Sequence, residues 1–201
     1  ACTNFIATRG ATTDGSVFVT YSADDYGMFG KLCHYAAGKH AKGTKREIVD
    51  YDSGESHGFI DEAPETYNVI GNINEYQVSI GETTYGGRKE MVDNTGLIDY
   101  GSLMYLGLQR SKTAREAIKI MTDLVEKYGY QSGGESFTIA DPDEVWILEM
   151  MGCGGDKKQK VVWVAVRIPD GMISGHANQA RIGQFSTYNT DVMKSKNCIK
   201  F

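Results

Sequence analysis

The sequence has few cysteines, no long apolar run and no stripe of basic residues. Its four cysteines are too sparse for a disulfide scaffold, and no pair has the C-x-x-C spacing of a zinc or redox site. They leave room for one disulfide bridge. No apolar stretch approaches the length that spans a bilayer, so no membrane partner is expected. The net charge of -5 and the lack of a Lys/Arg stripe argue against a nucleic-acid partner.

What remains is an ordinary globular composition. Apolar residues make up 41% and charged residues 23% of the 201 residues, which suits one soluble domain over residues 1–201 with a sizeable core. The sequence starts at Ala1 rather than at a methionine, which indicates that a targeting segment or a short propeptide was removed upstream. A targeting segment would make the protein secreted or periplasmic, whereas a propeptide leaves its localisation unknown.

A cysteine stands next to the start of the chain. If Ala1 is removed, Cys2 carries a free α-amino group beside its thiol. Because an α-amine titrates near pH ~8 and a thiol near pH ~8.5, the amine can take the thiol proton. Cys2 then combines a nucleophile and its base in one residue. Three other interpretations stay open: a small apolar strand residue, half of a disulfide, or the remnant of a lipoprotein signal.

A β-hairpin is predicted directly after this cysteine. Residues 2–7 are expected to form a short strand, Asp14-Gly15 is a strong turn signal, and residues 17–21 are rich in β-formers. The return strand would bring residues 21–24 beside Cys2. The hairpin therefore places the carboxylate of Asp24 near the N-terminal amine.

The middle of the chain predicts a few loops and short strands, then a hairpin, then two helices. Residues 25–66 are expected to be loops with short strands such as 46–51, and residues 67–87 to be two strands joined by a turn at Asn74-Glu75. Helices are expected over 99–110 and from the capping box at Thr113 to a C-cap at Gly129. The histidines of this region have no ligand-like spacing and are interpreted as structural or surface residues: His34, His40 and His57.

Strands dominate again after the helices. The pattern predicts strands over 136–140, 145–150, 161–168 and 172–177, and the start of a helix over 191–201. Because strands and helices do not alternate, the expected class is α+β, with antiparallel sheet covered by helices.

Several blocks of the chain together resemble one family. The chain is similar to the cysteine dipeptidases of the dipeptidase A type, which are relatives of the secernins within the N-terminal nucleophile (Ntn) hydrolases. The matching blocks are Ala1-Cys2-Thr3, Ala11 with Asp14-Gly15-Ser16, Asn74-Glu75-Tyr76-Gln77, Gly81-Glu82-Thr83-Thr84, Leu108-Gln109-Arg110, Thr113-Ala114-Arg115-Glu116-Ala117, Gly134-Glu135-Ser136-Phe137, Glu144-Val145-Trp146 and Gly175-His176-Ala177-Asn178-Gln179-Ala180-Arg181.

The resemblance implies a four-layer αββα sandwich with Cys2 on an inner strand. Because family members are about twice this length, it also implies that the chain is the N-terminal part of a longer protein, incomplete at its C-terminus. A missing C-terminal segment or a second copy of the chain would then complete the fold. The expected partner in the reaction is a small peptide, and neither a cofactor nor a metal is expected.

The resemblance also assigns roles to single residues. Cys2 would be the nucleophile of a cysteine peptidase, Asp24 would orient its ammonium group, and Asn178 would bind the oxyanion with a donor near Thr84. Tyr21 occupies the position where wider relatives, such as penicillin V acylase, have an arginine beside the nucleophile. The expected substrate-binding residues are Tyr21, Glu82, Thr83 and Thr84, and Glu82 could hold the free amine of a dipeptide or be a solvated strand-end carboxylate.

Two other functions stay open at this point. Wider relatives include penicillin V acylase and conjugated bile acid hydrolase, which cleave amides of other small molecules. The chain could also be a non-catalytic binding relative that has kept the fold, which Tyr21 and the retained Ala1 favour.

Overall fold

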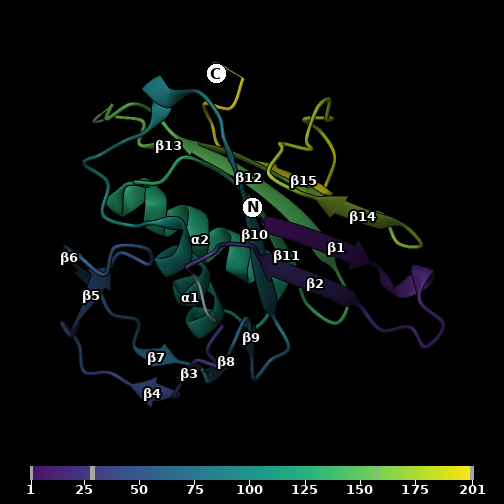
Figure 1. The fold of residues 1–201 in the computed structure, drawn as a ribbon, viewed down its shortest axis with the longest axis horizontal. Coiled ribbons are helices and arrows are strands. Elements are labelled where there is room, and N and C mark those ends of the chain that lie inside the picture. Colours follow the sequence, from purple (N-terminus) through teal and green to yellow (C-terminus); the bar gives the residue numbers. More distant parts are fainter. Residues whose placement is uncertain (1, 28–29, 157, 200–201) are drawn as a thin grey trace.

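Two antiparallel sheets lie face to face, and two helices cover the outer face of the larger one (Figure 1). The computed structural model describes residues 2–27, 30–156 and 158–199. Over this part of the chain the layers follow the order helices, eight-stranded sheet, three-stranded sheet. The class is therefore α+β, in agreement with the layered sandwich that the resemblance implies.

The larger sheet supplies most of the core. Its strand order is β15-β13-β12-β11-β10-β9-β8-β3. The strands are β3 (His34–Tyr35), β8 (Val69–Ile70), β9 (Ile73–Asn74), β10 (Ser79–Gly86), β11 (Gly134–Ala140), β12 (Val145–Gly152), β13 (Val161–Arg167) and β15 (Val192–Lys194). All residues of β11 are buried, because helices cover one face of this strand and the second sheet lies over the other.

The smaller sheet has the order β14-β1-β2 and carries the N-terminus of the chain. Its strands are β1 (Cys2–Ala7), β2 (Phe18–Ala23) and β14 (Ile173–His176). The predicted hairpin is confirmed: β1 and β2 pair antiparallel with Cys2 opposite Ala23, and Gly15 takes a positive φ of 75° in the turn. A short 3₁₀ helix, η1 (Arg9–Ala11), precedes that turn.

Four short strands form two hairpin-like ladders outside these sheets. They are β4 (Gly38–Lys39) with β7 (Glu65–Thr66), and β5 (Lys45–Val49) with β6 (Ser56–Asp61). The strand predicted over residues 46–51 is confirmed as β5, which starts one residue earlier and ends two residues earlier. A second 3₁₀ helix, η2 (Lys89–Met91), follows β10.

Both predicted helices are present, and α2 has the predicted residues at its two caps. Helix α1 (Tyr100–Arg110) starts after Asp99, whose carboxylate accepts a hydrogen bond from the Ser102 N–H. Helix α2 (Ala114–Tyr128) starts after Thr113, whose hydroxyl accepts from the Glu116 N–H, and ends at Gly129 with φ of 85°. Their apolar faces pack on β10–β13 because side chains three and four residues apart share one face of a helix. No described helix is long and apolar enough to cross a membrane.

The helix expected from residue 191 onward is wrong. Residues 192–194 instead form β15, which pairs antiparallel with β13 so that Val192 lies opposite Val166. An open edge of a large sheet offers unpaired N–H and C=O groups, and pairing there satisfies both partners. A local pattern over a few residues carries no information about that edge.

The outer face of the small sheet is open in the described part of the chain. Phe5, Phe18 and Ile173 lie on this face and are all more than half exposed. No described helix covers them, so the described residues form three of the four layers that the resemblance implies. That a further segment or a second copy of the chain covers this face stays a prediction.

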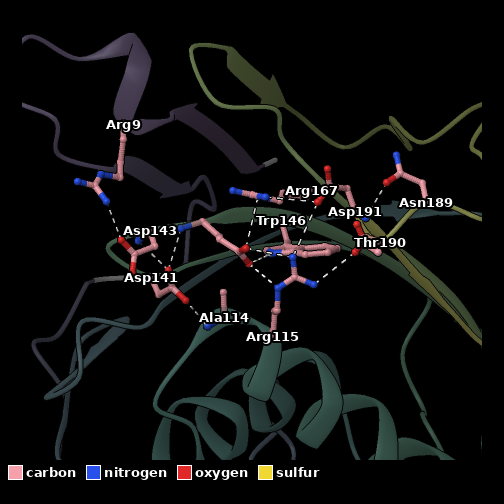
Figure 2. Close-up of polar contacts among 11 residues, drawn as sticks. Arg9, Ala114, Arg115, Asp141, Asp143, Trp146, Arg167, Asn189, Thr190 and Asp191 are labelled. Carbon is pink, nitrogen blue, oxygen red and sulfur yellow. Dashed lines mark hydrogen bonds and ion pairs between the residues drawn. The ribbon is translucent and has the colours of Figure 1, made fainter.

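Arginines neutralise the carboxylates at the turn between β11 and β12. Arg115 at the start of α2 donates to both oxygens of Glu144, at 2.8 and 3.0 Å, and its guanidinium lies 4.6 Å from the centre of the Trp146 ring (Figure 2). Arg167 and the Trp146 indole N–H also reach Glu144. Asp141 accepts from the Ala114 N–H. This network ties α2 to the β11–β12 turn.

Candidate active site

The N-terminal strand directs Cys2 toward the large sheet. Successive side chains of a strand alternate between its faces, and Asn4 and Ile6 of β1 are buried whereas Phe5 is exposed. Cys2 has the same parity as Asn4. The Asn4 amide donates to the Glu82 carbonyl at 2.8 Å and so fixes β1 against β10.

Gly81 allows this close approach of the two sheets. A Cβ at this position would lie 2.5 Å from Asn4 Oδ1 and 3.1 Å from Tyr21 Cβ. Any larger residue would push β1 and β2 away from β10. The glycine next to Glu82 is therefore what lets the side chains of Cys2 and Tyr21 reach that carboxylate.

The Cys2 thiol meets a carboxylate. Its sulfur lies 3.4 Å from Glu82 Oε1, within hydrogen-bond distance for a thiol donor. Burial, followed by the charge of Glu82 and this hydrogen bond, raises the pKa of the Cys2 thiol to about 12. In this arrangement Cys2 is a neutral thiol at pH 7. Ala1, whose removal the mechanism requires, lies outside the described residues.

Glu82 is the centre of the polar cluster. The Tyr21 hydroxyl donates to Glu82 Oε1 at 2.6 Å, and burial together with the Glu82 charge raises the pKa of Tyr21. Glu82 is only 2% exposed. The alternative interpretation of Glu82 as a solvated strand-end carboxylate is therefore wrong. The structure brings together three of the predicted residues, Cys2, Tyr21 and Glu82.

Glu135 completes the cluster, and sequence reasoning did not single it out. It lies opposite Thr84 in the pairing of β10 with β11 and is hydrogen-bonded to Glu82. The Thr84 hydroxyl lies 2.9 and 3.1 Å from its two carboxylate oxygens. Burial and the neighbouring Glu82 charge raise the pKa of Glu135. The one signal in the sequence was its place in the Gly134–Phe137 block.

Asn178 holds the other side of Cys2. Its side-chain oxygen accepts from the Cys2 backbone N–H at 2.7 Å, and its NH₂ group donates to the Thr84 carbonyl at 2.7 Å. The residue has a φ of 55°, a left-handed conformation that asparagine tolerates better than most residues. Glu149 accepts from the backbone N–H groups of Arg181 and Ile182, which anchors the segment behind Asn178.

Asp24 lies one residue beyond the pairing partner of Cys2. Its side chain is exposed and accepts from the Ser22 hydroxyl at 2.7 Å. A backbone hydrogen bond from Asp24 to the Cys2 thiol weakly opposes the rise in the thiol pKa. The position agrees with the predicted proximity to the N-terminal amine. Its role in orienting that amine stays a prediction.

Thr83 has its hydroxyl directed between the two sheets. It lies 2.6 Å from His176 Nδ1, and the other ring nitrogen of His176 lies 2.7 Å from the Thr138 hydroxyl. Burial lowers the pKa of His176 to about 4, so the imidazole is neutral at pH 7. The Thr83 hydroxyl thus links β10 to β14, and its predicted part in substrate binding remains a prediction.

A cavity of about 810 Å³ opens beside this cluster. It is lined by residues of the β1–β2 hairpin, the β9–β10 turn and the β11–β12 turn, and it includes Tyr21, Ile80 and Gly81. Cys2 does not line it. The Tyr21 side chain forms a boundary between this cavity and the carboxylate that its hydroxyl contacts.

One group of described side chains could hold a cation. Ligand atoms of Asp50, His57 and Asp99 all lie within 4.8 Å of one another. His57 Nε2 lies 3.8 Å from an Asp50 oxygen and Asp99 caps α1, so a side-chain contact and a helix cap give these residues structural roles. All four cysteines are free thiols, which removes the disulfide interpretation of Cys2.

The site therefore combines a thiol, a buried carboxylate pair and an amide where two stacked sheets meet. Such groups suit acyl transfer, in which a nucleophile, a proton acceptor and an oxyanion donor must converge. The profile of Peptidase family C69 matches residues 41–201. The chain belongs to this family. The matched range includes Glu82, Glu135 and Asn178 and leaves Cys2, Tyr21 and Asp24 outside.

A curated relative points to the same family. The chain is 27% identical over 199 residues to a protein of Latilactobacillus sakei described as a probable dipeptidase, and the match covers 90% of this chain. It covers 40% of that protein. The chain thus spans about two fifths of the length of this relative.

Proposed function

We propose that the chain is the nucleophile-bearing part of a cysteine-type dipeptidase. The observation that carries the proposal is the contact between the Cys2 thiol and the buried Glu82 carboxylate beside Asn178. Membership of a peptidase family and the probable dipeptidase among its relatives support the reaction class.

The reaction would proceed through a thioester. After loss of Ala1, the Cys2 α-amine takes the thiol proton, and the sulfur attacks the carbonyl carbon of the peptide bond. The resulting ammonium gives this proton to the leaving amine as the C–N bond breaks. Water then attacks the thioester with the α-amine as base, which releases the acid and restores the thiol. Asp24 would orient the ammonium form of the α-amine.

The oxyanion needs hydrogen-bond donors. The NH₂ group of Asn178 has two hydrogens, and the Thr84 carbonyl accepts one of them. The second hydrogen and a donor near Thr84 would bind the oxyanion, with each such donor typically worth about 3–4 kcal/mol.

The carboxylate of Glu82 would bind the free α-ammonium group of a dipeptide, with Tyr21 holding the carboxylate in place. A buried negative charge next to the nucleophile favours a cationic substrate over the neutral or anionic amides that acylases cleave. This observation supports a dipeptidase over an amidase of the penicillin V acylase or bile acid hydrolase type.

The test is hydrolysis of dipeptides by the wild type, by Cys2→Ala and by the matched control Cys33→Ala, with intact mass recorded for each protein. We expect hydrolysis by a chain that starts at Cys2, its loss in Cys2→Ala and its retention in Cys33→Ala. Equal hydrolysis of N-acetylated dipeptides would instead indicate an amidase of the acylase type. Undiminished hydrolysis by Cys2→Ala would refute the cysteine mechanism.

A further inference from the structure

Glu82 and Glu135 are two buried carboxyl groups in direct contact. They lie on the adjacent strands β10 and β11, are 2% and 0% exposed, and are hydrogen-bonded to each other. None of the ion pairs among the described residues involves either of them. Two such groups without a cation cannot both ionise, so the pair shares one proton and carries one negative charge.

The negative charge lies on Glu82. The hydroxyl of Tyr21 and the thiol of Cys2 both donate to it, and Glu135 is its third partner. Glu82 Oε2 has no N–H or hydroxyl donor among the described residues, which leaves it open to the carboxyl group of Glu135. Glu135 in turn accepts from the Thr84 hydroxyl. The two donors on Glu82 Oε1 therefore match a carboxylate acceptor at Glu82.

This charge acts directly on the nucleophile. The Glu82 oxygen is 3.4 Å from the Cys2 sulfur, a distance at which a like charge strongly disfavours the thiolate. The substrate that the proposed function requires, a dipeptide with a free amine, brings a positive charge to the same carboxylate. The binding of that ammonium group would cancel the charge that keeps the thiol protonated.

We propose that the Glu82–Glu135 pair is a charge switch that holds Cys2 as a thiol in the empty site and releases it when the ammonium group of a dipeptide binds to Glu82. The inference rests on the proposed function and deepens it. On binding, the substrate N–H replaces the thiol S–H as donor to Glu82, and the thiol proton passes to the Cys2 α-amine. No proton is lost or gained by the pair itself.

Other groups near the pair leave this charge balance in place. Besides Cys2 and Tyr21, the titratable side chains with an electrostatic effect on it are Tyr51, Asp52, Tyr85, Tyr100, Tyr130 and His176. Burial raises the pKa of the four tyrosines and lowers that of His176, so all five are neutral at pH 7. Asp52 adds negative charge, and Asp24 lies on the other side of Cys2. The described contacts include no positive side chain at the pair.

The switch makes the amine a requirement for chemistry as well as for binding. A peptide with a blocked amine could still occupy the site but would leave Cys2 protonated. We therefore expect N-acetylation of a dipeptide to lower kcat, beyond any rise in KM. This separates the switch from a carboxylate that only adds affinity, because uniform binding changes KM alone.

The test is the pH profile of Cys2 alkylation by iodoacetamide, followed by peptide mass spectrometry with Cys33 as the internal reference. The probe is alaninol, a small cationic amine without a scissile amide, and N-acetylalaninol is its neutral counterpart. At pH 8, where the amine of alaninol is still cationic, we expect alaninol to speed Cys2 alkylation about threefold and N-acetylalaninol to leave the rate unchanged. A one-unit fall in the Cys2 pKa gives about ten times more thiolate, but a thiolate of lower pKa is also less nucleophilic, which offsets part of the gain.

Two matched variants locate the charge. Glu82→Gln should lower the Cys2 midpoint by about one unit or more without ligand and abolish the response to alaninol. Glu135→Gln keeps a donor to Glu82 and keeps the Glu82 charge, so its response to alaninol should match that of the wild type. A wild-type profile in Glu82→Gln, or no response of the wild type to alaninol, would refute the switch.

Failure of the switch and failure of the proposed function can be told apart. If Cys2→Ala abolishes dipeptide hydrolysis while alaninol leaves the Cys2 alkylation rate of the wild type at pH 8 unchanged, the peptidase stands and the switch is wrong. If Cys2→Ala still hydrolyses dipeptides, the cysteine mechanism is wrong whatever the alkylation profiles show. Circular dichroism of Glu82→Gln and Glu135→Gln checks that both variants keep the native fold.

Discussion

Strand β11 has a carboxylate cluster near each end, and arginines neutralise only one of the two clusters. At its start, Glu135 shares a proton with Glu82 and contacts no arginine among the described residues. Beyond its end, Glu144 lies between Arg115 and Arg167. The pKa of Glu135 is raised by burial, whereas hydrogen bonds and charge from Arg115 lower the pKa of Glu144 despite partial burial.

The difference shows how one strand can serve both stability and chemistry. Arg115 donates two hydrogen bonds to Glu144, stacks on the Trp146 ring and donates to the Thr190 carbonyl in the segment before β15 (Figure 2). Its charges are satisfied, so nothing is left to attract a ligand. The glutamate pair is buried with an uncompensated charge beside a thiol. A site that keeps its charge unpaired is the one that can take a cation from outside.

The largest expected effect is on the amide beside the nucleophile. Asn178→Gly should lower kcat by about 100-fold, because it removes an oxyanion donor. Stability should fall by about 1–2 kcal/mol, because the hydrogen bonds to Cys2 and Thr84 are lost although glycine adopts the φ of 55° without strain. Steady-state kinetics and urea unfolding of the same preparation test both parts. Full activity in this variant would exclude Asn178 from the oxyanion site.

An arginine placed beside the glutamate pair should neutralise its charge, as Arg115 and Arg167 do for Glu144. In Tyr21→Arg the guanidinium would pair with Glu82 and block the substrate ammonium, which should lower kcat/KM for dipeptides about thirtyfold, or about 2 kcal/mol. The Cys2 midpoint in alkylation should fall without any ligand. Tyr21→Phe is the control, since it removes the hydroxyl and adds no charge. Retained dipeptide activity in Tyr21→Arg would contradict an ammonium site at Glu82.

An arginine removed from the turn cluster should cost stability. Arg115→Ala loses the two hydrogen bonds to Glu144 and the contact with the Trp146 ring. We expect the free energy of unfolding to fall by about 2 kcal/mol. Arg115 is itself partly exposed, which keeps the effect below that of a fully buried pair. Arg115→Lys should recover part of the loss in urea unfolding. The alkylation profile of Cys2 should not change in either variant.

Glu144 and Glu135, near the two ends of β11, should change the free energy of unfolding with pH in opposite directions. The lowered pKa of Glu144 contributes stability that is present above its unfolded value and lost as the pH falls below about 4.5. Glu144→Gln should therefore be less stable than wild type at pH 7, by about 1 kcal/mol, with the difference closing in acid.

The raised pKa of Glu135 makes its contribution to stability larger in acid than at neutral pH. Its contribution is fully present below the unfolded value of 4.5 and is lost as the pH rises toward the folded value. Relative to the wild type, Glu135→Gln should gain up to about 1.4 kcal/mol of unfolding free energy for each pH unit between pH 4.5 and about pH 8. Urea unfolding of both variants across this range gives two curves of opposite slope. Parallel curves would show that the two carboxyls are in equivalent environments.

The smallest expected effect is at the surface beside the arginine cluster. Arg9 and Asp143 form an ion pair at 2.7 Å, but both side chains are more than half exposed. Asp143→Asn should change the free energy of unfolding by less than about 0.5 kcal/mol. A loss above 1 kcal/mol in urea unfolding would mean that the Arg9–Asp143 contact belongs to the network around Glu144.

The sequence alone determined the local elements and the identity of several site residues. The hairpin, both helix caps and most strands follow from turn residues, capping boxes and apolar periodicity, because these act over a few neighbouring residues. The proximity of Asp24 to Cys2 followed from the same hairpin. The ordered motifs pointed to a peptidase family before any contact was known.

Only the tertiary structure decided which side chains meet. The pairing of β10 with β11 places Glu135 against Glu82, 53 positions apart in the sequence, and the two sheets meet where Gly81 leaves room for Cys2. The strand at 192–194 likewise depends on an open sheet edge. Contacts between distant residues are set by sheet register and layer packing, which a short stretch of sequence does not encode. The shared proton of the glutamate pair is therefore a property of the fold.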